Sequence, residues 1–133
     1  MHGNTAKITA LLQRETDLFS RHGGRIPEAN EELNSLQRDK INAVYECHGK
    51  AYIGKKNHYG TERENLTVDS VFTEYTGQMV YNFGADYVVP AEDKELANLV
   101  LQWNTGGQTA SPSFINKITN RIGELGGVNL VWS

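Results

Sequence analysis

Residues 68–89 carry the strongest β-strand pattern in the chain, so they constrain the fold more than any other stretch. Apolar and polar side chains alternate over residues 71–75 and again over residues 79–83, after a Thr-Gly pair. This alternation predicts a β-hairpin. A three-residue loop ending in a left-handed Gly77 places the apolar residues of both arms on one face, whereas a two-residue loop places Glu74 among aromatic side chains. We therefore favour the three-residue loop.

Three further stretches are expected to join this sheet. Residues 86–89 predict a strand that ends where Pro90 removes a backbone donor. Alternation over residues 43–53, interrupted by a His-Gly-Lys turn, predicts a second hairpin. The apolar run at 128–132 predicts a last strand paired with the sheet, because an apolar terminus is costly to leave exposed.

Four other stretches place apolar residues at helical spacing and carry helix start and stop signals. The second of them, which begins at Pro27 and ends near Ile41, has a thin apolar stripe, so we expect it to be half exposed or covered by a partner. The four helices are expected over residues 5–22, 27–41, 91–103 and 112–125.

Together these elements predict one α+β domain over residues 1–133. Its sheet is expected to be largely antiparallel, with about five strands, and to pack with four helices, two N-terminal and two near the C-terminus. A chain of 133 residues is long enough to bury a single core without disulfides or metals.

Charge and composition exclude several classes of function. The net charge is −3, and residues 67–133 hold only Lys94, Lys117 and Arg121 against seven acidic residues. Binding to nucleic acid depends on cations that face phosphates, so no nucleic-acid partner is expected. Cys47 is the only cysteine, and no apolar run approaches the ~20 residues of a membrane span. We expect a soluble, cytoplasmic protein with no membrane contact.

Cys47, His48 and His58 are the nearest approach to a catalytic or metal-binding cluster. On a strand, Cys47 and His48 point to opposite faces and cannot hold one ion, so no metal site and no cofactor are predicted. His58 opens a polar loop in which Tyr59 and Glu62 could serve as acid or base. The corresponding hypothesis is a small hydrolase or nuclease-type enzyme that uses His48 or His58 with Glu62 or Tyr59.

All six tyrosines lie between residues 45 and 87, which predicts an aromatic sheet face able to stack a planar ligand or bury a partner. A loop containing two glycines follows Trp103 and could overhang one end of this face. The alternative is that Trp103 and most of the tyrosines are ordinary core residues. The predicted ligand-binding residues are Tyr45, Tyr81, Trp103, Thr105, Gln108 and Thr109.

The leading hypothesis is therefore a small binding or protein-interaction module that acts through the aromatic sheet face. Its partner would be a protein or a small molecule, and the chain could form a homodimer through this face or through an open sheet edge. The thin stripe of the second helix also favours a partner. No set of residues identifies a reaction.

Overall fold

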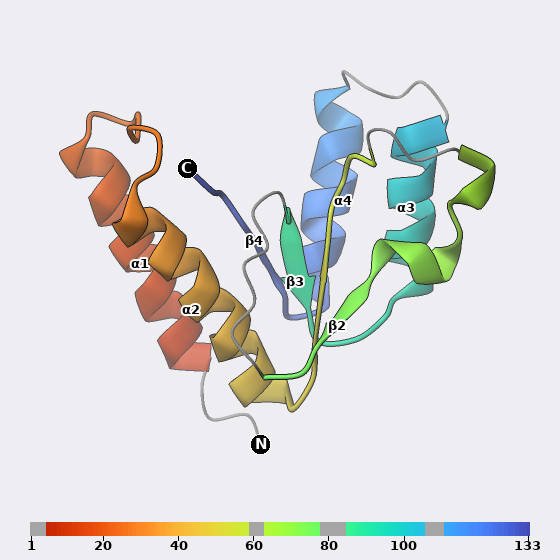
Figure 1. Ribbon diagram of the computed structural model, residues 1–133, viewed down its shortest axis with the longest axis horizontal. Coiled ribbons are helices and arrows are strands. Elements are labelled where there is room, and N and C mark those ends of the chain that lie inside the picture. Colours follow the sequence, from red (N-terminus) through yellow and green to blue (C-terminus); the bar gives the residue numbers. More distant parts are fainter. Residues whose placement is uncertain (1–4, 59–62, 78–84, 106–110) are drawn as a thin grey trace.

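The computed structural model describes residues 5–58, 63–77, 85–105 and 111–133, which form an α+β fold in three layers. A sheet lies in the centre, α1 and α2 cover one face, and α3 and α4 cover the other (Figure 1). The elements in chain order are α1 (Thr5–Arg21), α2 (Glu31–His48), β1 (Ala51–Gly54), the 3₁₀ turns η1 (Arg63–Asn65) and η2 (Val68–Val71), β2 (Thr73–Tyr75), β3 (Tyr87–Val89), α3 (Lys94–Thr105), α4 (Pro112–Glu124) and β4 (Val128–Asn129).

The described strands form a four-stranded antiparallel sheet in the order β2-β1-β3-β4. Ala51 of β1 pairs with Tyr75 of β2, and Tyr52 pairs with Val89 of β3 on the other side. The last strand, β4, pairs with β3 and lies at the edge. The α+β class and the four helices are thus confirmed, with one strand fewer than the five or so that were predicted.

Local capping signals explain where the helices begin. Asn30 precedes α2, and its side-chain oxygen accepts a hydrogen bond from the N–H of Leu33 at 2.9 Å. Ser111 caps α4, where proline occupies the first turn. Asp93 accepts from the N–H of Leu96 at 2.8 Å just before α3. Such caps satisfy backbone donors that have no partner inside the helix.

The second predicted hairpin is wrong in its first arm. Residues 43–48 complete α2 instead, and Gly49 ends the helix in the left-handed conformation with φ of 79°. Only the second arm forms a strand, β1. The apparent alternation is misleading because Val44 and Cys47 continue the helical stripe that buries Lys40 and Ile41 one turn earlier.

The first predicted hairpin is confirmed only in part. Residues 68–71 form η2 rather than strand, where the N–H of Thr67 donates to the hydroxyl of Ser70 at 2.9 Å. The strand begins at Thr73, and Gly77 is left-handed as predicted, with φ of 91°. The second arm, residues 79–83, lies outside the described residues.

Helix α2 was expected to be half exposed or covered by a partner; nine of its 18 residues are buried, and other parts of the same chain cover them. Leu33 and Leu36 pack against α1, whereas Ile41 and Val44 pack against the sheet. The apolar stripe is thin in the sequence because three of the buried positions of this helix are polar. These residues are Asn34, Gln37 and Lys40, which are 3%, 0% and 1% exposed.

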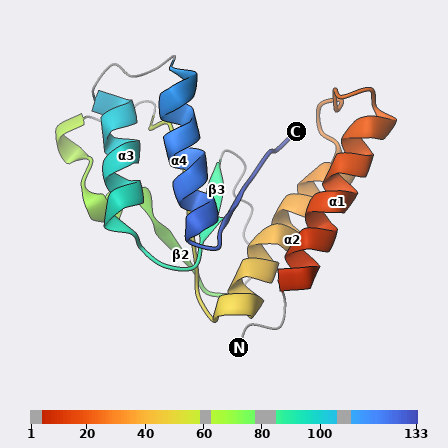
Figure 2. The same cartoon turned by 180° about the vertical axis from the view of Figure 1, so that it is seen from behind.

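The polar side chains of α2 bind residues 131–133, which we call the C-terminal segment. Gln37 accepts from the N–H of Val131 at 2.9 Å, and Asn34 accepts from the N–H of Ser133 at 3.1 Å. The indole N–H of Trp132 donates to the carbonyl of Ala85 at 2.8 Å. Figure 2 shows this segment crossing from the foot of α4 towards the α1/α2 pair. Polar contacts therefore fix it between α2 and the sheet.

Candidate functional site

The structure separates two of the residues predicted to line one binding pocket. Tyr45 lies on α2, where its ring packs edge-to-face on Tyr75 at 5.5 Å between centroids. Trp103 lies on α3, beyond the sheet, and stacks on Phe114 at 6.0 Å. Because the sheet stands between the two helix layers, Tyr45 and Trp103 cannot contact one small ligand.

The other predicted pocket residues give little support to a cleft at Trp103. Thr105 is exposed and its hydroxyl donates back to the carbonyl of Leu101 at 2.8 Å. Tyr81, Gln108 and Thr109 lie outside the described residues. The cleft predicted from the sequence therefore stays a prediction, without Tyr45 as a member.

Two of the three tyrosines on the described strands, Tyr75 and Tyr87, are buried, and the third, Tyr52, is half buried. Tyr75 and Tyr87 are 5% and 0% exposed, and Tyr87 packs edge-to-face on Phe72 at 6.3 Å. Burial raises the pKa of the Tyr87 hydroxyl well above its ordinary value, and this hydroxyl donates to the carbonyl of Val71 at 2.7 Å. The rings of Tyr75 and Tyr87 belong to the hydrophobic core, so they offer no open face to a ligand.

Of the three residues singled out for chemistry, two belong to the end of α2. Cys47 is buried, and His48 follows it as the last residue of the helix. Among the described residues, no group of three histidine, cysteine or acidic side chains could hold a metal ion. His58 lies elsewhere, after β1.

Residues 55–58 are fastened to the C-terminal end of α3. The amide of Asn104 donates to the carbonyl of Lys56 at 2.8 Å, and its oxygen accepts from the N–H of His58 at 2.9 Å. The indole N–H of Trp103 donates to the side chain of Asn57. Side chains of α3 therefore hold the backbone of His58 and of the residues before it in place.

A pocket of about 130 Å³ lies beside this segment, and we call it the His58 pocket. Three separate parts of the chain supply its wall: the end of β1 with the segment that follows it, the stretch from η2 to β2, and Ala85, two residues before β3. The described lining residues are Ile53, Gly54, Lys55, His58, Ser70, Val71, Thr73 and Ala85.

The imidazole of His58 has one satisfied nitrogen and one unsatisfied nitrogen. Its ring bonds to the backbone of Lys55, and its Nε2 is buried without a partner among the described residues. Nδ1 is therefore the nitrogen that donates to the Lys55 carbonyl, which leaves the lone pair on Nε2 in the neutral ring. Burial is the main cause that lowers the pKa of His58, so the neutral ring prevails near pH 7.

Positive charge lies at one side of this pocket, at Lys55 and Lys56. Lys55 lines it, and Lys56 follows with a side chain whose pKa is lowered mainly by burial. Asp86 is the acidic group that acts on both Lys56 and His58, and its Oδ2 already accepts from the backbone N–H of Lys56 at 2.7 Å. No carboxylate is present among the described lining residues.

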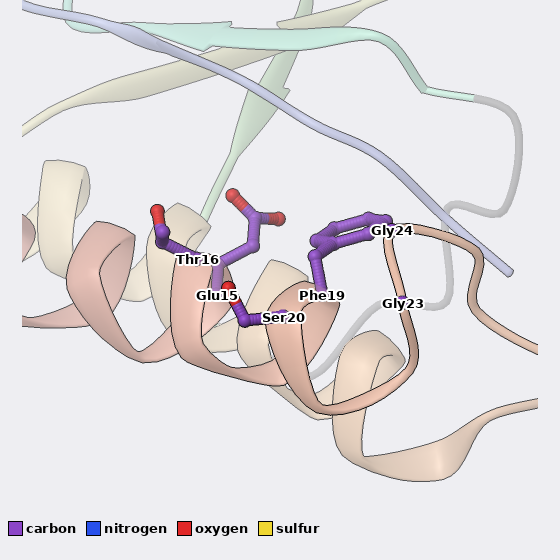
Figure 3. Close-up of a pocket in the computed structure, with 6 residues that line it drawn as sticks. All are labelled: Glu15, Thr16, Phe19, Ser20, Gly23 and Gly24. Carbon is purple, nitrogen blue, oxygen red and sulfur yellow. The ribbon is translucent and has the colours of Figure 1, made fainter.

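Two other pockets lie on the layer formed by α1 and α2. One of about 540 Å³ follows the end of α1, where Figure 3 shows Glu15 and Phe19 on the side of the helix that faces the C-terminal segment. Both oxygens of Glu15 are occupied, by Lys40 at 3.1 and 3.3 Å and by Gln37 at 2.7 Å. The other, of about 340 Å³, lies between α1 and α2 and mixes charges of both signs. Neither has a buried polar group left for a ligand among its described lining residues.

Sequence analysis identified His58 but missed the residues that hold it. Asn57 and Asn104 had no signal of their own, because polar residues at a loop and at a helix end are common. The partial signal was Trp103, whose indole N–H needs a hydrogen-bond partner when it is half buried. That partner is Asn57.

Comparisons of the chain with protein-family models, with curated proteins and with solved structures found no match. Among the described residues, no helix is long and apolar enough to cross a membrane. A functional proposal therefore depends on the geometry of the described residues alone.

Proposed function

We propose that this protein is a small binding module whose ligand occupies the His58 pocket. The observation that carries the proposal is the buried Nε2 of His58, which has no partner among the described residues. Buried polar atoms in proteins almost always have a hydrogen-bond partner, and a missing one is expensive. A ligand in the adjacent pocket would supply the partner that the described chain does not.

The backbone around His58 supports this proposal. The bonds from Asn104 and Trp103 hold residues 56–58 on the end of α3, a regular element of the core. A site whose supporting atoms are already fixed loses little conformational freedom when a ligand binds. Binding at the aromatic sheet face has less support, because Tyr75 and Tyr87 are buried.

The substitution His58→Asn tests the proposal directly. Asparagine can keep the short donor to the Lys55 carbonyl, and it removes the nitrogen at the Nε2 position. We expect small polar molecules to shift the ring NMR signals of His58 in the native protein, and the variant to lose that binding. His22→Gln, at an exposed position after α1, is the matched control and should bind as the native protein does.

The proposal is wrong if no small polar molecule in a diverse set shifts the His58 signals. It is equally wrong if His58→Asn binds the same molecules with unchanged affinity. Urea unfolding of both variants separates loss of the site from loss of the fold.

A second candidate is the hydrolase or nuclease-type enzyme, and the lowered pKa of His58 favours it. A histidine that is neutral near pH 7, with its lone pair on a buried Nε2, is able to act as a general base. The acid or base partners proposed with it, Tyr59 and Glu62, lie outside the described residues. Turnover of ester and phosphodiester substrates that His58→Asn abolishes would favour this candidate, whereas binding without turnover would exclude it.

The expected homodimer stays a separate proposal with weaker support. The thin stripe of α2, one reason to expect a partner, is covered by α1, by the sheet and by the C-terminal segment. Light scattering at high protein concentration tests it, and a monomer mass would remove it.

A further inference from the structure

The charges around the His58 pocket indicate the class of its ligand. Resting on the function proposed above, we infer that the ligand is a small oxyanion of the phosphate or carboxylate type, held by His58 and Lys55 in the pocket wall, with the neighbouring Lys56 as a second cation. Lys55 and His58 line the pocket with no carboxylate among its described lining residues, and Lys56 follows Lys55 in the chain. Asp86, the acidic group that acts on Lys56 and His58, already accepts from a backbone N–H.

Lys56 is the cation that gains most from an anion. Its side chain is partly buried, and it has no salt bridge among the described residues. Burial lowers the pKa of Lys56, and the attraction of Asp86 opposes that effect only in part, so the charged form of this side chain is disfavoured. An anion in the neighbouring pocket would favour the charged form, whereas a cation or a neutral ligand would not.

The size of the pocket and the hydroxyls in its wall restrict the ligand further. A volume of about 130 Å³ is well below the ~300 Å³ or more of pockets for drug-sized ligands. The Ser70 hydroxyl is already engaged with Thr67, from which it accepts at 2.9 Å and to which it donates at 2.7 Å. Apart from the Thr73 hydroxyl, the cationic groups are therefore the side-chain donors left for a ligand of a few heavy atoms.

Binding of an anion must be coupled to uptake of a proton by His58. In the free protein the ring is neutral near pH 7 and Nε2 can only accept. Negative charge beside Nε2 favours the imidazolium, opposes the effect of burial and turns this nitrogen into a donor. The charged groups that act on the ring among the described residues are Lys55 and Asp86. Affinity for an oxyanion should accordingly rise as the pH falls, whereas a neutral donor would bind better at high pH.

The test uses inorganic phosphate, acetate and neutral acetamide as probes, at constant ionic strength, with the His58 ring signals followed by NMR. Phosphate or acetate should raise the pKa of His58, and acetamide should not. Lys56→Gln should weaken anion binding about tenfold, the effect of losing a charge-assisted contact. Lys117→Gln, at an exposed position of α4, is the matched control and should bind anions as the native protein does.

The outcomes separate this inference from the function on which it rests. If acetamide shifts the His58 signals and the anions do not, the oxyanion is excluded and a binding site remains. If none of these probes nor any other small polar molecule shifts them, both proposals fail. Equal loss of anion binding in Lys56→Gln and Lys117→Gln would mean general charge attraction and would overturn the inference.

Discussion

Replacing Glu15 with glutamine removes the counter-ion of the most deeply buried lysine in the described structure. Lys40 is 1% exposed, and its ammonium contacts both carboxylate oxygens of Glu15 and the amide oxygen of Gln37 at 3.0 Å. Burial lowers the pKa of Lys40, and the Coulombic attraction of Glu15 opposes this effect. The native lysine is thus stabilised as a cation by a carboxylate that is itself largely covered.

The expected loss follows from this geometry. Removing one partner of a buried ion pair costs about 3–5 kcal/mol, because the other charge is left uncompensated. We expect the low end, about 3 kcal/mol, since the new amide oxygen can still accept from Lys40 and Gln37. That is a large part of the ~5–15 kcal/mol of a typical domain. With a urea dependence of about 1–3 kcal/mol per molar, the midpoint should fall by roughly 1–3 M.

Two further variants show whether the uncompensated charge on Lys40 causes the loss of stability. Lys40→Met in the Glu15→Gln background removes that charge and should restore most of the lost free energy. Glu46→Gln breaks the pair with Lys7, whose side chains are about half exposed, and should cost about 0–1 kcal/mol. Equal midpoints for Glu15→Gln and Glu46→Gln, or no recovery in the double variant, would refute the reasoning.

Two other predictions concern packing and pH. Gly54→Ala should destabilise the fold by about 1–3 kcal/mol, because the new Cβ would lie 2.3 Å from the Val71 carbonyl oxygen. Gly123→Ala in α4 meets nothing within 4 Å and should stabilise the fold slightly. Thermal unfolding of both variants checks this prediction, and equal melting temperatures would contradict it. Arg121 lowers the pKa of Asp93, so the Asp93 carboxylate stabilises the fold above its unfolded pKa of about 4, and this stability is lost as the pH falls through the folded pKa. Asp93→Asn should therefore lower the free energy of unfolding near pH 7 and change it little near pH 2. A loss of stability that does not depend on pH would exclude the ion pair as its cause.

Helices α1, α3 and α4 were predictable within a few residues because their signals are local. Ser111 with Pro112 fixes the start of α4, and the glycines after Arg21 fix the end of α1. Apolar residues at helical spacing then determine which side is buried. Such signals act within one or two turns, so they do not depend on the rest of the fold.

The extent of α2 and the strand order were not predictable for a different reason. Gln37 and Lys40 belong to the buried side of α2 only because Glu15 and Val131 supply their partners from distant parts of the chain. Likewise β1 lies between β2 and β3, which the local alternation cannot reveal. The sequence marked His58 as a candidate, but the burial of its Nε2 depends on neighbours that are distant in the chain, such as Asn104.

The attachment of the C-terminal segment has a consequence for how the chain folds during synthesis. Asn34 and Gln37 find their partners 99 and 94 residues later, at Ser133 and Val131. Until those residues leave the ribosome, α1 and α2 can pair with each other only without the hydrogen bonds from Val131 and Ser133 to these amides. Contacts across such long separations slow folding, so we expect the α1/α2 layer to dock last although it is made first.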